Sequence, residues 1–463
     1  MNFVALIPGI LAIVWLLKKT PQETFISLYL PVLLILPNYY RCMLPGLPDP
    51  TMNEAAIIPL FVVWAVKGEK HWKFSVTDFL VLGYAFCVGF SEYLNAGYNE
   101  AQNLMVDMIC TVVMPYILAK SLIEPHGLRE IFAKRVVWLI FIISVTAFYE
   151  FKFGATPFRL VLDRFFPGQG EGWVTTFRNG FARIAGPYGH AILAGVIIII
   201  GYRLARWLEW CGAWELQFKK LKWFNKLSKA QLITLGILAG SIMTGCRGPW
   251  LGGIAAAVVV ALGRTKKRTL GIVLVLSGIL FIGIPAAISF WSYASVGRAK
   301  AKSDSQETAA YRKELMDKYI DIAIERSVWG WGRNTYPKVS GMPSIDNYFL
   351  LLSLMHGLIA LGFLVGLFLW MFVRLLKRGF SLPPSVPAGS SLAFTLAGIY
   401  LAIFISIATV YMGEQVVHLL FILSGWAEAY LQSKKEGLGR DNENNLSNVS
   451  LATNYFNFRR VLT

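Results

Sequence analysis

Three arginines on separate segments are the residues best suited to chemistry on an anion. Arg183 lies in RIAGPYGH, Arg247 in the Gly-rich turn TGCRGPW, and Arg312 in a long polar segment. A guanidinium group donates two parallel hydrogen bonds to a phosphate or a carboxylate. If the three segments meet, their arginines could bind a pyrophosphate and stabilise the charge that develops as it leaves.

A carboxylate accompanies these arginines. Asp346 stands in SIDNYF, directly before an apolar run, and Asn347 follows it. Asp346 could take a proton from an acceptor hydroxyl as a general base, or it could only cap the helix that begins there. His190, placed two helical turns beyond Arg183, and Glu414, in a short connection, are further candidates to line the site together with Asn347. No His, Cys, Asp or Glu cluster has the spacing of a metal site.

Each arginine also has an ordinary structural explanation. Arg183 precedes Gly186 and Pro187, which are expected to start a helix whose dipole would favour an anion, but it could equally snorkel to phospholipid head groups. Arg312 could be a solvated charge on an external helix. The position of Arg247 favours a functional role, because an arginine near the hydrocarbon core is costly and is usually paired or functional.

The elements that carry these residues are predicted to be membrane helices. The chain has 463 residues, of which 56% are hydrophobic and only 15% charged, whereas soluble proteins carry about 25% charged residues. Repeated apolar stretches predict an all-α integral membrane protein with 12 to 13 transmembrane helices over residues 1–432. The spans are expected to be helical because a helix satisfies its own backbone hydrogen bonds, which lipid cannot do. The net charge of +17 comes without a nucleic-acid-binding signature, so no nucleic acid partner is expected.

The distribution of positive charge predicts which side of the membrane each connection faces. Most of the 44 Lys and Arg residues lie in one alternating set of connections, and the positive-inside rule makes that set cytoplasmic. Arg183, Arg247, Arg312 and Asp346 then all lie on the outer side. The polar tail 433–463 is expected to be cytoplasmic and disordered.

The long external segment 292–347 is expected to be partly helical. Asp304 and Glu307 resemble a capping arrangement, and the helix that follows has apolar residues at Leu315 and Tyr319. The turn 330–332, which reads Gly-Trp-Gly, is expected to bring the chain back to the membrane. We therefore expect this segment to form a lid that contributes Arg312 and delivers Asp346 to the membrane edge.

Taken in order, these motifs resemble the O-antigen ligase/polymerase superfamily, which includes O-antigen ligases and Wzy-type polysaccharide polymerases. The resemblance covers about residues 180–370 and rests on R-x-x-G-P at Arg183, C-R-G-x-W-L-G at Arg247, the loop arginine Arg312, G-x-G at 330–332, and D-N-x-x-L followed by H-G-L-I-A-L-G from Asp346 onward. O-antigen ligases have a histidine where this chain has Asp346, so the pattern is closer to exopolysaccharide polymerases or related ligases.

This resemblance implies a GT-C-like fold and a glycosyltransferase that needs neither metal nor cofactor. Its donor would be an oligosaccharide on undecaprenyl pyrophosphate, and its acceptor a glycan or lipid hydroxyl, at the periplasmic face of the bacterial inner membrane. Arg183 and Arg247 match the family arginines that hold the pyrophosphate, and Arg312 matches the loop arginine. A flippase and a chain-length regulator are partners of such enzymes, alongside membrane lipids.

Two other classes of function remain open from the sequence. Ligase-type transfer to a lipid or protein hydroxyl would use the same residues. A transporter of a lipid-linked glycan or an organic anion would show internal repeats and a site at the membrane midplane. The sequence shows no convincing repeat, and its candidate charges gather at one surface. A non-enzymatic scaffold would leave Arg247 unexplained.

Overall fold

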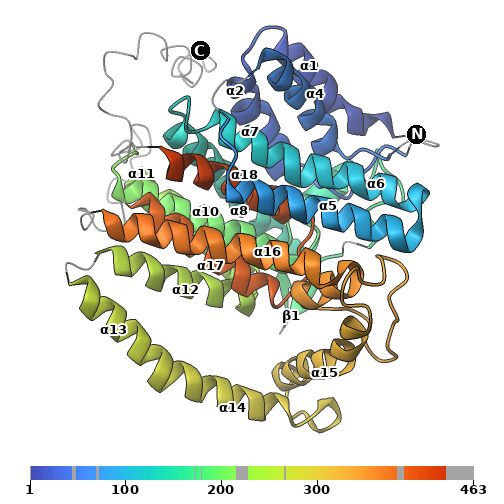
Figure 1. Ribbon diagram of the computed structural model, residues 1–463, viewed down its shortest axis with the longest axis vertical. Coiled ribbons are helices and arrows are strands. Elements are labelled where there is room, and N and C mark those ends of the chain that lie inside the picture. The colour runs from blue at the N-terminus through green and yellow to red at the C-terminus, as the bar shows by residue number, and fades with distance from the viewer. Residues whose placement is uncertain are drawn as a thin grey trace.

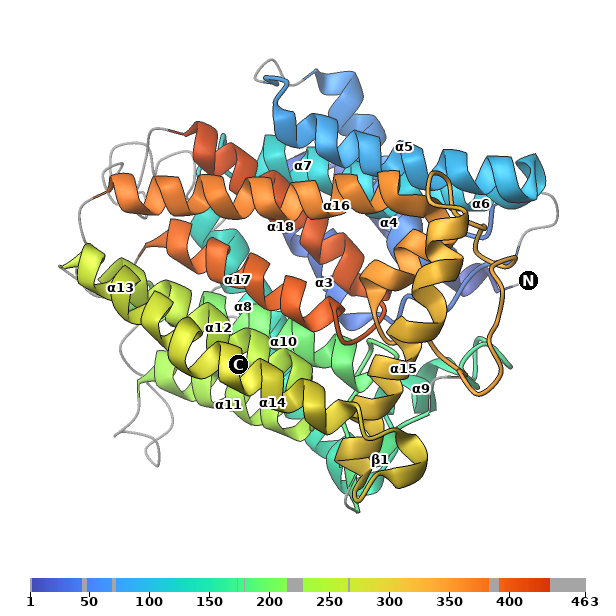
Figure 2. The same cartoon turned by 60° about the horizontal axis from the view of Figure 1, so that its bottom comes forward.

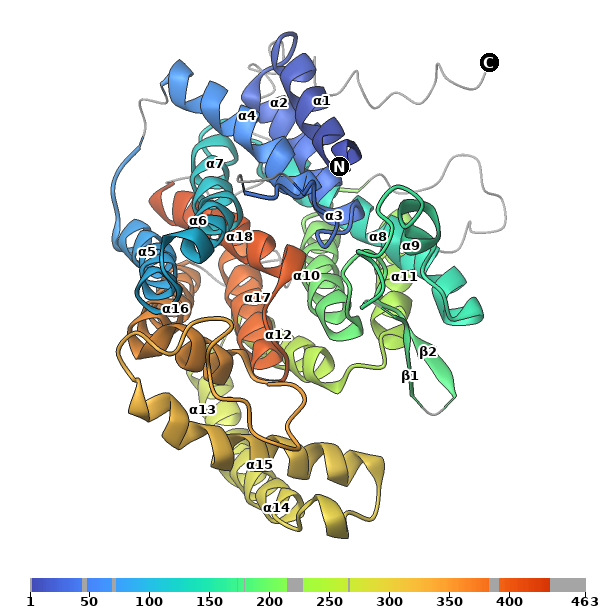
Figure 3. The same ribbon diagram turned by 90° about the vertical axis from the view of Figure 1, so that its right-hand side faces the viewer.

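Long helices run side by side through the computed structural model, and a small two-stranded hairpin lies at one end of them (Figures 1 and 2). The structure describes residues 2–43, 48–68, 72–172, 174–178, 180–214, 228–264, 267–382 and 391–433. Seen from another side, many of the helices point toward the viewer, and α13 to α15 form a separate outer row (Figure 3).

The first half of the chain is helical as far as the hairpin. Its elements are η1 (Phe3–Leu6), α1 (Ile7–Leu16), α2 (Pro21–Thr24), η2 (Phe25–Tyr29), α3 (Leu30–Ile35), α4 (Met52–Lys67), α5 (Val76–Ala96), α6 (Tyr98–Met108), η3 (Ile109–Val113), α7 (Met114–Leu122), α8 (Arg129–Phe153), α9 (Pro157–Leu162), β1 (Thr176–Arg178) and β2 (Phe181–Arg183).

The second half continues as helices interrupted by the long polar segment. Its elements are α10 (Ala191–Trp210), α11 (Lys229–Met243), α12 (Arg247–Arg264), α13 (Arg268–Gly278), η5 (Ile279–Gly283), α14 (Ile284–Ala294), η6 (Arg298–Lys300), α15 (Asp304–Glu325), α16 (Tyr348–Ser381), α17 (Leu392–Ile407) and α18 (Glu414–Gln432).

These helices confirm the predicted all-α membrane protein. Six helical stretches of the described residues are long and apolar enough to cross a membrane by length and composition, and five shorter apolar helices accompany them. Within the bundle α5 packs on α16, α7 on α18, and α12 on both α17 and α10.

Among the described residues, three helices contain a π-helical turn, and proline explains all three. The turns η2, η3 and η5 each precede an α-helical segment with proline at its second position, at Pro31, Pro115 and Pro285. Proline has no amide hydrogen, and its ring clashes with the carbonyl four residues earlier. That carbonyl lies inside the π turn in each case, so the wider turn relieves the clash while the helix continues.

Helix α16 is broken near its first third, which the sequence did not indicate. Gly357 has φ 79° and ψ 177°, so it interrupts the helix between His356 and Leu358. The backbone groups freed by the break are bonded by the returning chain: the Leu358 amide donates to the Ser327 carbonyl at 2.6 Å. A break at this depth is tolerated because protein, not lipid, satisfies the exposed backbone.

Hydrogen bonds to α16 confirm the predicted return of the chain at the Gly-Trp-Gly turn. The amides of Trp331 and Gly332 donate to the carbonyls of Leu354 and Met355, both at 2.8 Å. A Cβ at Gly330 would lie 2.6 Å from the Met355 carbonyl group, so only glycine permits this approach. The long segment is thereby fixed to α16 just before it carries Asp346 back to the start of that helix.

Candidate functional site

The hairpin places two arginines on one face. Thr176 pairs with Arg183 and Arg178 pairs with Phe181 in an antiparallel register. Residues two apart on a strand share a face with their cross-strand partners, so Arg178 and Arg183 point the same way. Arg183 was expected at the site from its sequence motif, whereas Arg178 was not, because nothing local revealed that five residues later the chain would return beside it.

Both hairpin arginines bond the turn that precedes α12. Arg183 donates from Nε to the Thr244 carbonyl at 3.2 Å and from Nη2 to the Cys246 Sγ at 2.9 Å. Arg178 donates from Nη1 to the Gly245 carbonyl at 3.0 Å. Gly245 has φ +60°, a conformation that suits glycine. The hairpin and the turn are therefore held together as one unit.

Arg247 is the first residue of α12 and follows this turn directly, as the sequence predicted. It is exposed, and the structure gives its guanidinium no hydrogen bond or ion pair with any described residue. It stands at a helix N-terminus, where the backbone dipole also favours an anion. Of the arginines here, it is the one left most free to bind a ligand.

A buried carboxylate on α8 supports the hairpin from behind. Glu150 is fully buried. It accepts hydrogen bonds from the Thr175 hydroxyl at 2.8 Å and from the amides of Ala185 and Gly186 at 3.1 and 2.8 Å. Glu150 therefore holds the chain on both sides of the hairpin. Its position as an acid inside an apolar run was the signal that could have revealed it.

Aromatic side chains attach the hairpin to the end of α8. Phe181 stacks on Phe151 with ring centroids 6.0 Å apart and an interplanar angle of 5°. A Cβ at Gly154 would lie 2.8 Å from the Phe177 ring. A cavity of about 660 Å³ lies between α8 and the hairpin, lined by these rings and by Lys152. These ring contacts attach the hairpin that carries Arg178 and Arg183 to the end of α8.

Arg312, in the long polar segment, lies near the same end of α12 as Arg247. It lies on α15, whose buried residues Leu315 and Tyr319 confirm the predicted apolar face. Its Nη2 donates to the Thr409 carbonyl at 3.2 Å, at the end of α17. A Cβ on Gly248, in the first turn of α12, would clash with the Thr409 side chain. Arg312 is therefore bonded to the residue that touches the Arg247 end of α12.

The Arg312 guanidinium still has an unused donor. Its Nε is buried and has no partner among the described residues. An unpaired buried donor is costly, and it is well placed to bond a ligand oxygen. Burial lowers the pKa of Arg312, and the charge of Asp346 partly reverses that effect.

The four arginines act on one another electrostatically. Burial lowers the pKa of Arg178, and the positive charges of Arg183, Arg247 and Arg312 lower it further. Like charges this close repel, and a bound anion would relieve the repulsion. Arg178 and Arg183 bond the turn before Arg247, and Arg312 bonds Thr409 beside the first turn of α12, so the four arginines gather around the start of that helix.

Asp346 faces this cluster and does not cap α16, which corrects one of the two roles considered for it. The N-cap is Asn347, whose Oδ1 accepts from the Leu350 amide at 3.2 Å. Asp346 is half-buried and accepts from the Ser344 hydroxyl at 2.9 Å. Its charge acts on Arg312 and on His190. The carboxylate is thus left for another role.

His190 lines the site but does not lie inside a helix, because α10 begins four residues after Pro187, not at it. His190 is its N-cap, and its Nδ1 accepts from the Ile192 amide at 3.2 Å. Burial and the charge of Arg183 lower its pKa, which favours the neutral ring. Similarly, α15 is capped by Ser303, one residue before the predicted Asp304.

Two further sequence expectations have different outcomes. Glu414 begins α18, but its side chain lies outside the described part of the structure. Its neighbour Gln415 is buried and donates to the carbonyls of Leu36 and Pro187 at 2.9 and 3.3 Å. Among the described residues, no three His, Cys, Asp or Glu side chains form a group that could hold a metal ion.

Part of the chain is similar to a known protein family. No curated protein shows a significant match. Residues 232–356 match the family model described as O-antigen ligase, and this segment runs from α11 through the first part of α16. The match supports the resemblance carried by the motifs over this segment, which holds Arg247, Arg312 and Asp346 and is similar to the O-antigen ligase family.

Proposed function

We propose that this protein transfers a glycan from undecaprenyl pyrophosphate to an acceptor hydroxyl, and that it polymerises the repeat units of an exopolysaccharide or O-antigen. The observation that supports this most is the convergence of four arginines opposite one carboxylate. The family match supports ligase- or polymerase-type glycosyl transfer in general. The site would face the periplasm at the inner membrane, with the C-terminus in the cytoplasm.

The arginines would bind the pyrophosphate and stabilise it as the leaving group. Arg247 and the free Nε of Arg312 offer donors that no described residue uses. Arg178 and Arg183 add positive charge while holding the turn in place. Positioned donors of this kind stabilise negative charge as it develops, because they need not reorganise during the reaction. Guanidinium groups would thereby fill the role that a metal ion has in other pyrophosphate-releasing enzymes.

Asp346 would serve as the general base. It would take the proton of the acceptor hydroxyl while that oxygen attacks the anomeric carbon of the donor sugar. The bond between the anomeric carbon and the pyrophosphate oxygen breaks with its electron pair leaving on the pyrophosphate. His190, which is favoured in its neutral form, would orient a sugar or phosphate oxygen through Nε2.

The test replaces Arg247 in cells that make the polymer. Arg247→Ala should lower transfer about 10²- to 10³-fold, the usual effect of losing one positioned donor, and lipid-linked repeats should accumulate. Arg247→Lys should rescue little, because lysine lacks the bidentate fork. Lys338→Ala changes an exposed cation of the same outer segment and should leave transfer unchanged. Normal polymer in Arg247→Ala cells would overturn the proposed mechanism.

Asp346→Asn tests the base separately. Loss of general-base catalysis should lower the rate about 10²- to 10⁴-fold, while donor binding persists. Full activity in Asp346→Asn would remove the proposed role. Purified protein that moves a lipid-linked glycan across liposomes without forming a glycosidic bond would instead indicate a transporter.

A further inference from the structure

One membrane helix stands apart from the bundle. The continuous stretch from α13 through α14, Arg268–Ala294, has the highest mean hydropathy of the six long stretches, 2.5, yet only 6% of it is buried. Every residue from 279 to 293 is exposed. Figure 1 shows this helix bowing away from α12 between its two attached ends. The helix therefore presents apolar surface on all sides, including the side toward the protein.

Its two ends are nevertheless fixed. At the start, Arg268 donates to the carbonyls of Phe380 and Leu382, at the end of α16. At the C-terminal end of the helix, the Tyr293 carbonyl accepts from the Gln306 side-chain amide at 3.3 Å, and Lys313 Nζ lies 5.3 Å from the Trp291 ring centroid. The helix is attached at both ends and unpacked between them, so its exposed middle part faces the exposed side of α12 without packing against it.

Helix α12 presents a matching face to this space. Leu251, Ile254 and Val258 are 58%, 63% and 41% exposed. With Arg247 they are spaced by four, three and four residues, which places all of them on one face of a helix. The opposite face is tightly packed: a Cβ at Gly252 would lie 2.6 Å from the Ala402 carbonyl of α17. Figures 1 and 3 both place α12 between α17 and the α13–α14 helix.

This face of α12 is chemically complementary to an amphiphilic molecule with an anionic head. Its outer end is a cation within a cluster of four arginines, and its remainder is apolar for about 16 Å, at 1.5 Å per residue. A polyprenyl pyrophosphate has an anionic head of two phosphates and an apolar chain. A zwitterionic phospholipid would bring its own ammonium group toward four arginines, which is unfavourable.

We propose that the polyprenyl chain of the lipid-linked donor lies along Leu251, Ile254 and Val258, enclosed by α13–α14, while its pyrophosphate lies at Arg247. This assignment rests on the proposed function and adds to it the path by which the donor is held. The enclosed lipid space would also explain why so apolar a helix is kept apart from the bundle yet fixed at both ends.

Photo-crosslinking in native membranes tests the position of the chain. A benzophenone side chain at Ile254 should capture polyprenyl-linked glycan several-fold more than one at Ile142, an apolar residue of α8 that is 46% exposed. Capture should persist in the Asp346→Asn background and fall in Arg247→Ala. Capture of phospholipid alone at Ile254, or equal capture of donor at Ile142, would overturn the assignment.

Chain-length dependence of transfer separates this inference from the proposed function. In Leu251→Gln and Ile254→Ser, KM for the full-length donor should rise about tenfold, as is typical when apolar contacts in a specificity site are lost. KM for a donor with a two-isoprene chain should not change. An equal change for both donors would overturn the chain assignment while glycan transfer stands. If the wild-type protein transfers glycan from neither donor, the proposed function itself fails.

Discussion

Two groups of charges, one at each end of the helix bundle, are held in different ways. At the end away from the hairpin, buried cations have carboxylate partners: Lys120 Nζ lies 2.7 Å from Asp78, and Arg129 Nη2 lies 2.7 Å from Glu124. Arg374 pairs in the same way with Glu428. At the hairpin end, Arg178, Arg183 and Arg312 donate to backbone carbonyls and a thiol, Arg247 has no partner among the described residues, and Asp346 is the carboxylate that faces them.

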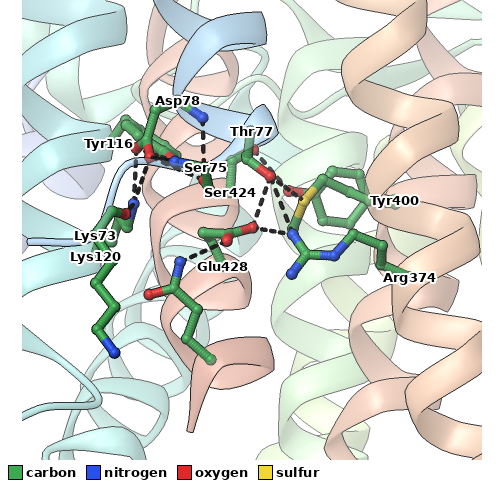
Figure 4. A network of polar contacts seen from close by, with 12 residues as sticks. Lys73, Ser75, Thr77, Asp78, Tyr116, Lys120, Arg374, Tyr400, Ser424 and Glu428 are labelled. Carbon is green, nitrogen blue, oxygen red and sulfur yellow. Dashed lines mark hydrogen bonds and ion pairs between the residues drawn. The ribbon is translucent and has the colours of Figure 1, made fainter.

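Figure 4 shows how complete the pairing is at the first of these ends. Asp78 accepts from Lys120, from the Tyr116 hydroxyl at 2.7 Å, and from the Ser75 hydroxyl at 2.9 Å. Glu428 accepts from the Thr77 hydroxyl at 2.6 Å as well as from Arg374. These contacts join α5, α7, α16 and α18. Paired charges here connect helices, whereas the four arginines beside the hairpin have no ion pair among the described residues and are available to a ligand.

Breaking a pair should therefore affect folding, and Lys120→Met is expected to give the largest effect. It leaves the fully buried Asp78 carboxylate without its counter-charge, which typically costs about 3–5 kcal/mol. The measurement is the unfolding transition of the purified protein in detergent. Adding Asp78→Asn, which keeps the helix cap of α5 and removes the stranded charge, should recover part of the loss. A double variant no more stable than Lys120→Met alone would contradict this account.

Removing an unpaired charge should affect function instead, and Arg178 tests this outside the segment matched by the family. Arg178→Ala removes one of four guanidinium groups and the bond to Gly245. Transfer is expected to fall about 10- to 100-fold, because one of the four positioned cations is lost. The lost hydrogen bond to Gly245 should cost about 1.5 kcal/mol of stability, less than the loss expected for Lys120→Met.

Arg178→Lys distinguishes positive charge from hydrogen-bond geometry. Lysine keeps the charge but loses the fork, so it should be about tenfold better than alanine if charge dominates the effect. Transfer that is unaffected by Arg178→Ala, measured beside Arg247→Ala as the reference, would remove Arg178 from the site.

The contrast between the ends also explains what the sequence could predict. Arg247 was predictable, because orientation forces the chain to turn at the only break between two short apolar runs. The helices and the return of the Gly-Trp-Gly turn were predictable for the same local reasons. The ion pair of Lys120 was not predictable, because a basic residue at a helix end does not reveal a carboxylate that lies 42 residues away.

Residues that depend on distant partners were missed. Arg178 joins the site through a hairpin of three residues per strand, too short to show alternation. Glu150 is explained only by the backbone it bonds 35 and 36 residues later. Gly357 breaks α16 because the chain before it supplies the missing hydrogen bonds, and a single glycine in an apolar run is not otherwise a signal.

The smallest expected effect separates two adjacent residues. Asn347 caps α16, so Asn347→Ala should cost about 1 kcal/mol of stability, as N-cap losses typically do. Asp346→Ala removes no cap and should leave the unfolding transition nearly unchanged while transfer is lost. Asn347→Asp keeps the cap and serves as the control. Equal destabilisation by Asp346→Ala and Asn347→Ala would show that Asp346 belongs with the structural charges of the opposite end, not with the arginines it faces.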